Sequence, residues 1–356
     1  MIIAKPYILT IDPYKPGKSK VGNTQKVIKL SSNENALGAS PQAIEAYQSH
    51  TSKIFRYADG GCIELRNAIA KKYNINPDQL VCGAGSDEII ALLVQAFVEV
   101  GDEVLYSQHG FLMYPISAKR VGAIPIVASE INLTTNVDNI LAKISEKTKM
   151  IFIANPNNPT GSYINTNEVE RLINAVPKNI IIVLDLAYAE FVSKADYPDG
   201  IKLVNKYENV VVTRTFSKIY GLASLRIGWS YSSEYIADVL NRTRGPFNVG
   251  GPAQVAAIAA INDDEFVIKS INHNNKWLKI ISDELNKIGI KTHPSIANFI
   301  LIDFKTVENC QKYNEFLLKN GIIMREMAAY DLANCLRMTI GSEAENLRVL
   351  ELLNKY

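Results

Sequence analysis

The sequence has few of the residues that build metal centres and disulfide frameworks. It contains four cysteines and four histidines in 356 residues. The cysteines are scattered at positions 62, 82, 310 and 335, without a C-x-x-C pair, and the histidines show no metal-ligand spacing. We therefore expect reduced thiols and neither a metal site nor a dithiol redox site.

An excess of one charge and long apolar runs are also lacking. The 38 Lys and Arg residues nearly balance the 36 Asp and Glu residues, which leaves a formal net charge of +2. This balance gives no bulk attraction to nucleic acid or to a membrane. No segment approaches the ~20 apolar residues of a membrane span. The apolar runs near the start are interrupted by Lys5, Pro6 and Asp12, too early for a secretion signal. We therefore expect a cytoplasmic protein.

The length and composition are those of a globular protein of about two domains, with 47% hydrophobic and 21% charged residues. Residues 1–30 are rich in Lys, Pro and Gly and lack a clear period, which is typical of an arm. The pattern changes again after about residue 259. We therefore predict an N-terminal arm at 1–30, a large domain at 31–258 and a small C-terminal α/β domain at 259–356.

Short apolar segments alternate with helical patterns in the large domain. Ile and Val runs of this kind suit strands that are buried on both faces. The predicted strands are 79–82, 102–107, 124–128, 149–154, 180–185 and 209–214. Helices are expected at 89–97, with Ser86 as N-cap, and at 111–120, with Pro115 in the first turn. The alternation predicts an α/β fold with a mostly parallel central sheet flanked by helices.

Polar side chains follow three of these strands. Asn158 follows the strand at 149–154, Asp185 ends the strand at 180–185 with Tyr188 just after it, and Lys218 follows the strand at 209–214. In open α/β sheets ligands bind at the carboxyl ends of the strands. The sequence therefore predicts a site that holds an amide, a carboxylate, a phenol and an amine.

Such a set matches the needs of pyridoxal 5′-phosphate. The cofactor requires a lysine amine, for which Lys218 is the candidate, and a carboxylate beside its ring nitrogen, for which Asp185 is the candidate. Each residue alone also has a plainer interpretation, Lys218 as a solvated lysine, Asp185 as a turn or cap residue and Phe111 as a core aromatic. The alternative for Phe111 is stacking on the cofactor ring.

A phosphate cradle is predicted at G-A-G-S-D-E (83–88), where a strand leads into a helix N-terminus. The backbone N–H groups of Ser86 and Asp87 could hold a phosphate there. A nicotinamide fingerprint would need glycine where Glu88 stands, so that interpretation is weak. Thr215, Ser217 and Arg226 could add hydroxyl groups and a positive charge.

Several motifs, taken in order, resemble those of fold-type I aminotransferases. These are N-P-N-N-P-T-G (155–161), D-x-A-Y (185–188), T-F-S-K (215–218) and L-R-I-G-W (225–229). Five more resemble those of histidinol-phosphate aminotransferases: D-P-Y-K-P-G-K (12–18), S-S-N-E-N-A-L-G (31–38), R-Y-A-D-G (56–60), G-I-I-M-R-E (321–326) and L-R-M-T-I-G (336–341). The resemblance extends over nearly the whole chain.

The resemblance implies a role for each cofactor residue. Lys218 would hold pyridoxal 5′-phosphate as a Schiff base and shuttle the proton, with Asp185 at the pyridine nitrogen. Tyr188 and Asn158 would bond the phenolate oxygen, and Phe111 would stack on the ring. The phosphate would be held by Ser86, Asp87, Thr215, Ser217 and Arg226.

The resemblance also implies a homodimer in which Tyr57 reaches the neighbouring site. The substrate pocket would be lined by Tyr14, Tyr57, Asn158, Arg325 and Arg337, with the arginines meeting a phosphate or a carboxylate. The implied reaction exchanges an amino group between L-histidinol phosphate and 2-oxoglutarate, giving imidazole-acetol phosphate and L-glutamate in histidine biosynthesis.

Three alternatives remain open: an aromatic amino acid aminotransferase, a threonine-phosphate decarboxylase of related fold, and a non-enzymatic regulator. A regulator would normally carry a DNA-binding segment, and the arm has no helix-turn-helix pattern.

Two positions depart from the usual motifs. Leu186 replaces a glutamate in D-x-A-Y, and H-G-F (109–111) replaces a version that contains proline in many relatives.

Overall fold

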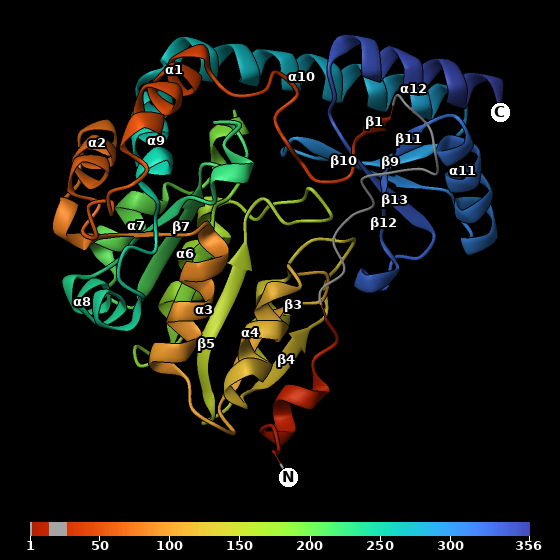
Figure 1. Cartoon of the computed structure of the whole chain (residues 1–356). Helices are drawn as coiled ribbons and strands as arrows, with labels where there is room; N and C mark the ends of the chain where they lie inside the picture. The colour runs from red at the N-terminus through yellow and green to blue at the C-terminus, as the bar shows by residue number, and fades with distance from the viewer. Residues whose placement is uncertain (1, 14–26) are drawn as a thin grey trace.

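The computed structural model describes residues 2–13 and 27–356 of the chain. Figure 1 shows a larger sheet surrounded by helices and a smaller sheet beside it, with the long helix α10 (Asp264–Lys287) running along the top of both. The fold is α/β, as predicted. Each sheet has its own buried apolar core, and the segments that link the two sheets carry much of the site described below.

The larger sheet has seven strands in the order β2-β8-β7-β6-β5-β3-β4. Its strands are β2 (Leu80–Gly83), β3 (Glu103–Ser107), β4 (Ile124–Ala128), β5 (Thr148–Ala154), β6 (Ile181–Asp185), β7 (Val210–Thr215) and β8 (Gly228–Tyr231). β8 pairs antiparallel with both of its neighbours, whereas the other pairs are parallel. The mostly parallel sheet is therefore confirmed, and all six predicted strands form, each bound lying within one residue of its predicted position.

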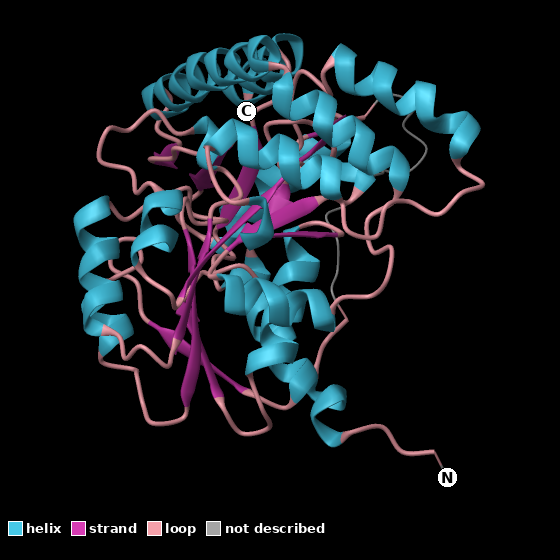
Figure 2. Cartoon of the chain, turned by 90° about the vertical axis from the view of Figure 1, so that its left-hand side faces the viewer, coloured by secondary structure: helices cyan, strands magenta, loops and turns pink. Residues whose placement is uncertain are grey.

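Helices cover both faces of this sheet, as Figure 2 shows with the strands seen nearly edge-on. One face packs against α3 (Ser86–Phe97), α4 (Met113–Val121) and α8 (Glu234–Thr243). The other packs against α2 (Ile63–Tyr73), α5 (Val137–Leu141), α6 (Thr166–Ala175), α7 (Gly200–Lys206) and α9 (Gly251–Asn262), with α1 (Pro41–His50) lying on α9. Ile151 and Phe152 in β5 point to opposite faces and are both fully buried, which explains the unbroken apolar run.

The smaller sheet is antiparallel, in the order β12-β13-β10-β9. Its strands are β9 (Lys291–His293), β10 (Phe299–Asp303), β12 (Arg325–Glu326) and β13 (Cys335–Thr339). Residues of α10, α11 (Val307–Lys319) and α12 (Glu343–Lys355) form one core with this sheet. Short 3₁₀ turns occupy Pro6–Thr10, Thr51–Lys53, Pro77–Gln79, Ala189–Phe191, Ala223–Leu225 and Ala328–Tyr330.

The segment just before residue 31 is tied to the C-terminal part of the chain. β1 (Ile28–Lys29) pairs in parallel with β11 (Ile322–Ile323). The backbone of Leu30 donates to Ile323 at 2.8 Å and accepts from Thr339 at 2.8 Å. The predicted domain boundaries at 30 and 258 stay predictions, but the end of the predicted arm is integrated into the C-terminal sheets.

The start of α3 differs from its prediction. Ser86 is the first residue of the helix, and Gly85 is the N-cap, with φ of 85°. The prediction that Ser86 caps the helix is therefore wrong. A left-handed φ is costly for residues with a side chain, and a Cβ on Gly85 would lie 2.4 Å from Nη2 of Arg226. Glycine lets β2 turn into α3 with the arginine packed against the turn.

Candidate active site

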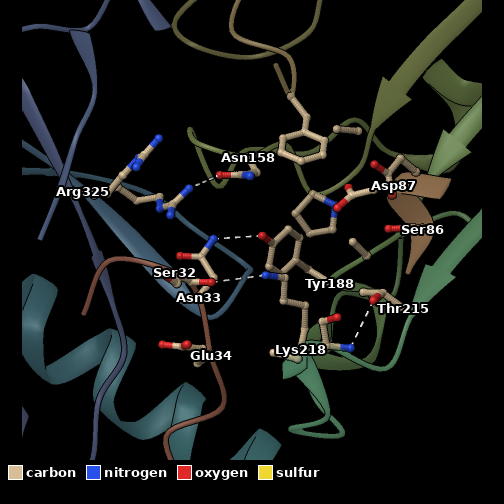
Figure 3. A pocket seen from close by; sticks show the side chains of 18 of the residues that line it. Ser32, Asn33, Glu34, Ser86, Asp87, Asn158, Tyr188, Thr215, Lys218 and Arg325 are labelled. Atoms are coloured by element: carbon tan, nitrogen blue, oxygen red, sulfur yellow. Dashed lines mark hydrogen bonds between the residues drawn. The ribbon is translucent and has the colours of Figure 1, made fainter. Parts of the chain in front are cut away.

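A cavity of about 290 Å³ lies where the carboxyl ends of the parallel strands meet the smaller sheet. It brings together twelve of the residues that the sequence singled out. They are Ser86, Asp87, Phe111, Asn158, Asp185, Tyr188, Thr215, Ser217, Lys218, Arg226, Arg325 and Arg337. Figure 3 shows Ser86 and Asp87 on one side of the cavity and Arg325 on the opposite side, with Tyr188 and Lys218 between them.

Lys218 presents its amine inside this cavity. The chain makes a turn after β7, and the Lys218 Nζ donates to the backbone carbonyl of Ser32 at 3.3 Å (Figure 3). The same nitrogen lies 5.6 Å from the centroid of the Tyr188 ring. Burial, reinforced by the positive charge of Arg337, lowers the pKa of the Lys218 amine to about 8. A larger neutral fraction, which is the nucleophilic and basic form, is therefore present near pH 7 than for an exposed lysine.

Asp185 ends β6 and is 6% exposed. Its carboxylate accepts hydrogen bonds from the Tyr114 hydroxyl at 2.8 Å and from the Thr213 hydroxyl at 3.1 Å. Burial raises the pKa of Asp185 to about 6, because these two hydrogen bonds only partly offset the loss of water. Among the described residues no cationic side chain contacts this carboxylate. A cation placed beside it would relieve the cost of burying its charge.

Tyr188 and Asn158 place a phenol and an amide on the same cavity. The Tyr188 hydroxyl accepts from Nδ2 of Asn33 at 2.9 Å (Figure 3), and burial raises the pKa of Tyr188 to about 12. Because its pKa is raised, the Tyr188 phenol keeps its proton at neutral pH and can donate it in a hydrogen bond. The side-chain oxygen of Asn158 accepts from Nη1 of Arg337, whose Nη2 donates to the Ser31 carbonyl at 2.9 Å.

Asn158 is held by the turn N-P-N-N-P-T-G, which follows β5. Two hydrogen bonds of 2.8 Å close this turn, from the Asn157 N–H to Ser162 and from the Gly161 N–H back to Asn157. A Cβ on Gly161 would lie 2.5 Å from that of Ser295 in the segment before β10. Glycine at 161 is therefore required for the turn to pack against the C-terminal part of the chain.

The predicted phosphate cradle assembles at one end of the cavity. Ser86 and Asp87 are the first two residues of α3, so their backbone N–H groups have no carbonyl partner within the helix. The Arg226 guanidinium lies 3.3 Å from the Asp87 carboxylate and 3.3 Å from the Ser217 hydroxyl. The Ser217 N–H donates to Thr215 Oγ1 at 3.1 Å. N–H groups, hydroxyl groups and a guanidinium thus converge where a phosphate monoester could bind.

Two properties of the chain itself fit pyridoxal 5′-phosphate. The first is the buried carboxylate of Asp185, which has no cationic partner within residues 2–13 and 27–356 and would gain one in a protonated ring nitrogen. The second is the close approach of backbone in the cradle, where a Cβ on Gly228 would lie 2.5 Å from the Ser86 nitrogen. The amine of Lys218 lies in the same cavity. The residues therefore fit the cofactor that the sequence predicted.

The predicted site residue Tyr57 does not line this cavity. Tyr57 is 85% exposed and stacks on Phe247, with ring centroids 4.7 Å apart, so it does not line the cavity of its own chain. Tyr14 lies outside the described residues. The roles of both residues stay predictions.

The structure adds residues that sequence reasoning missed. Tyr114, buried in α4, reaches Asp185, and Thr213 in β7 does so from the neighbouring strand. Tyr330 and the segment 31–34 also line the cavity. The motif S-S-N-E-N (31–35) marks this segment in the sequence, but the resemblance did not imply a role for its residues. No local signal marks Tyr114, because its partner is 71 positions away in the chain.

The two departures from the usual motifs lie beside the cavity rather than in it. Leu186 is fully buried and packs toward Gly200, where a Cβ would lie 2.6 Å from Leu186 Cδ1. His109 is 5% exposed and faces Glu130, with Nδ1 and Oε2 2.7 Å apart. Neither residue lines the cavity. Leu186 therefore contributes apolar packing at the start of α7.

Residues 2–13 and 27–356 contain no group of three or more His, Cys, Asp or Glu side chains arranged to hold a metal ion. Within the same ranges, none of the helices combines the length and apolarity that crossing a membrane requires.

Comparison with known proteins places these residues in a wider context. The family described as aminotransferase class I and II matches residues 25–353. Histidinol-phosphate aminotransferase of Paramagnetospirillum magneticum is 48% identical over 354 residues, which cover 99% of this chain and 98% of that protein. Histidinol-phosphate aminotransferase of Rhodopseudomonas palustris is also 48% identical, with the same coverage.

Solved structures share the fold. Histidinol-phosphate aminotransferase from Sinorhizobium meliloti in complex with pyridoxal-5′-phosphate superposes with a TM-score of 0.89 at 24% identity, covering 99% of this chain and 98% of that one. The aspartate aminotransferase from Thermus thermophilus with maleate gives a TM-score of 0.84 at 19% identity, over the full length of both chains. The predicted fold-type I architecture is therefore confirmed.

Proposed function

Because this chain belongs to the aminotransferase class I and II family, a family of pyridoxal-phosphate enzymes, we propose that it transfers the amino group of L-histidinol phosphate to 2-oxoglutarate. The products are imidazole-acetol phosphate and L-glutamate, and the reaction can run in either direction. The observation that supports this most strongly is the placing of the Lys218 amine, the buried Asp185 carboxylate and the phosphate cradle in one cavity.

Lys218 is the proposed catalytic base and the point of attachment. Pyridoxal phosphate, when bound, supplies an aldehyde that condenses with amines and a ring that takes up the electrons of a broken C–H bond. Burial lowers the pKa of Lys218 to about 8, which raises the fraction of neutral amine near pH 7. The neutral amine would take the proton from the substrate carbon that carries the amino group. It would then deliver that proton to C4′ of the bound cofactor.

Asp185 is proposed to hold the cofactor ring nitrogen in its protonated form. Its carboxylate is fixed by Tyr114 and Thr213 and has no cationic partner among the described side chains. A bound positive charge favours the ionised carboxylate, so binding is expected to bring the pKa of Asp185 down from about 6.

The other cavity residues are proposed to orient the cofactor. Tyr188, whose hydroxyl keeps its proton, and the Asn158 amide would donate to the phenolate oxygen, and Phe111 would cover a ring face. The phosphate would be held by Ser86, Asp87, Thr215, Ser217 and Arg226.

The substrate side is proposed to lie toward Arg325 and Arg337. Arg337 is 6% exposed and donates to Asn158 and to the Ser31 carbonyl, so a guanidinium is held in a fixed place at the cavity wall. A buried guanidinium is suited to bidentate recognition of a carboxylate or a phosphate. Both substrates of the proposed reaction carry such an anion, and the proteins that are 48% identical are named for histidinol phosphate.

We also propose a homodimer in the cytoplasm, in which Tyr57 reaches the cofactor phosphate and substrate pocket of the neighbouring subunit. Tyr57 is exposed and stacks on Phe247, which is 44% exposed, and Phe55, two residues earlier in the chain, is 74% exposed. Exposed aromatic side chains grouped in this way are typical of a surface that another protein covers.

A panel of amino donors and acceptors, monitored by the absorbance of the bound cofactor, tests the proposal. We expect kcat/KM for L-histidinol phosphate to exceed that for phenylalanine by at least about a hundredfold, because phenylalanine lacks the phosphate that the arginines at the cavity wall would bind. Equal values would favour an aromatic amino acid aminotransferase. Release of CO₂ from threonine phosphate would replace the proposed reaction with a decarboxylation.

A further inference from the structure

A buried, hydrogen-bonded pair, His109 and Glu130, lies next to the cavity but outside it. His109 follows β3 and Glu130 follows β4, so both stand at the carboxyl ends of neighbouring parallel strands. Their side chains are 7% and 1% exposed, and His109 Nδ1 lies 2.7 Å from Glu130 Oε2. Burying a carboxylate this deeply costs several kcal/mol unless donors surround it. Solvation at the surface therefore does not account for these two polar side chains.

The Glu130 carboxylate is surrounded by donors from one short segment. It accepts hydrogen bonds from the Ser107 hydroxyl, from the backbone N–H of His109 at 3.1 Å and from His109 Nδ1. A carboxylate only accepts hydrogen bonds, so a carboxylate at Glu130 makes His109 Nδ1 the donor in this contact. The Thr135 hydroxyl donates to Ser107 at 3.1 Å and completes the network. The backbone and the side chain of His109 are thus both fixed to Glu130.

This network fixes the turn that delivers Phe111 to the cavity. The Gly110 N–H donates to the backbone carbonyl oxygen of Ser107 at 2.7 Å. A Cβ at Gly110 would lie 2.9 Å from the same oxygen. Phe111 follows at once and lines the cavity, with its ring edge-on to Tyr114 at 5.9 Å. Gly110 has little intrinsic conformational preference. The hydrogen bonds from His109 and Ser107 to Glu130 supply the restraint on this turn.

The backbone of His109 also contacts the turn that holds Asn158. The carbonyl of His109 accepts from Nδ2 of Asn157 at 3.3 Å. Asn157 directly precedes Asn158, whose side chain lines the cavity. The backbone of one residue, His109, therefore connects the Phe111 turn with the turn that holds Asn158.

We propose that the His109–Glu130 pair is a positioning device for the cofactor. It holds Phe111 against one face of the ring and keeps the Asn158 turn in register, although neither member touches the ring. This inference rests on the proposed function, because it assumes that pyridoxal 5′-phosphate occupies the cavity.

The test compares the rate of cofactor release from the holoenzyme and the visible circular dichroism of the bound cofactor in four single variants and one double variant. His109→Leu removes the donor, His109→Asn keeps a donor near the Nδ1 position, and Phe111→Leu removes the ring. His273→Leu is the matched control, because His273 is also part-buried and hydrogen-bonded, to the Gly341 carbonyl at 2.9 Å, but lies away from the cavity. The double variant of positions 109 and 111 completes a mutant cycle.

We expect His109→Leu to speed cofactor release about tenfold, since it removes a hydrogen bond to a charged group, and to weaken the dichroism. His109→Asn should recover most of both signals, and His273→Leu should leave both unchanged. The double variant should release cofactor less rapidly than the product of the two single effects would give, because part of the effect of His109 acts through Phe111. Fully additive effects, or wild-type release from His109→Leu, would overturn the proposal.

A folding failure is separated from these outcomes by a second variant. If His109→Leu does not fold, Glu130→Gln takes its place, because it keeps the size of the side chain while removing the charge. Faster release and weaker dichroism from this variant would support the proposal, and wild-type values would overturn it. A wild-type protein that binds no pyridoxal 5′-phosphate would instead refute the proposed function.

Discussion

The hydroxyl of Tyr114 donates a 2.8 Å hydrogen bond to the carboxylate of Asp185, and both side chains are buried. Tyr114 is itself stacked on Phe152, with centroids 4.6 Å apart, so the hydroxyl has a fixed position. The hydrogen bond favours the ionised carboxylate and holds the pKa of Asp185 below the value that burial alone would give. This relationship sets how well the protein can stabilise a positive charge beside β6.

Replacing Tyr114 by phenylalanine is expected to raise the pKa of Asp185 further and to lower kcat about tenfold, the equivalent of about 1.4 kcal/mol. Steady-state kinetics measure the change. Tyr106→Phe is the matched control, since Tyr106 is 8% exposed and its ring lies 6.4 Å from that of Tyr114. Equal losses in the two variants would show that the hydroxyl bonded to Asp185 has no special role.

Asp185→Asn is expected to lower kcat at least about a hundredfold, because the amide carries no charge to hold a protonated ring nitrogen. A thermal scan of the same variant should show a folded protein. Turnover close to that of the wild type would exclude the electronic role proposed for Asp185.

The pH dependence of stability gives a second measurement on Asp185. Its pKa is about 6 in the folded protein against an ordinary 3.8, so the folded state binds the proton more tightly. The cofactor-free protein should therefore lose stability as pH rises from about 4 to about 6, by about 3 kcal/mol from this group. Urea unfolding across that range should show the loss in the wild type and not in Asp185→Asn. A matching decline in both proteins would contradict the raised pKa.

Lys218→Ala is expected to abolish turnover and the absorbance of the covalently bound cofactor. Borohydride reduction of the wild-type holoenzyme should fix the cofactor to the peptide that contains residue 218, as measured by mass spectrometry. Lys202→Ala serves as control, because the Lys202 side chain is 84% exposed. Labelling at another lysine, or turnover by Lys218→Ala, would reject the assignment.

Much of the site could be predicted from the sequence, because its residues follow strands that are themselves easy to identify. Asp185 and Lys218 come directly after apolar runs, and parallel strands bring their carboxyl ends to one edge. Tyr114 could not be predicted in this way. It lies in α4 and reaches Asp185 only because α4 packs on one face of the sheet. A single helical tyrosine gives no sign of which strand it will meet.

β8 was also missed, since Gly228–Tyr231 is four residues long and begins with glycine. Its antiparallel pairing with β7 shows only in three dimensions. The cap of α3 was misassigned because serine is the commoner N-cap, whereas the φ of 85° at position 85 favours glycine.

Arg337→Gln is expected to raise KM for the oxo acid about tenfold or more, because a buried charged donor is lost. Cofactor affinity should change less. Initial-rate measurements over a range of 2-oxoglutarate concentrations provide the value, with the surface variant Arg171→Gln as control, since its side chain is 40% exposed. An unchanged KM would remove Arg337 from the anion site.

Tyr57 offers a test of the proposed dimer. Tyr57→Ala and Lys218→Ala should each form impaired homodimers. Mixed dimers should regain activity, because one of their two sites combines an intact Lys218 with a Tyr57 from the other subunit. Unfolding and refolding the two variants together, followed by a rate measurement, gives the result. Absence of any gain in a confirmed mixed dimer would show that Tyr57 does not cross between subunits.

The pairing of β1 with β11 has a mechanical consequence. Ile28 and Leu30 are hydrogen-bonded to the β11 segment, and only one residue separates Leu30 from Ser32, whose carbonyl accepts from the Lys218 amine. A rotation of the C-terminal sheets would therefore pull directly on the rim that faces the reactive nitrogen. The orientation of the Lys218 amine is therefore coupled to the position of the C-terminal sheets.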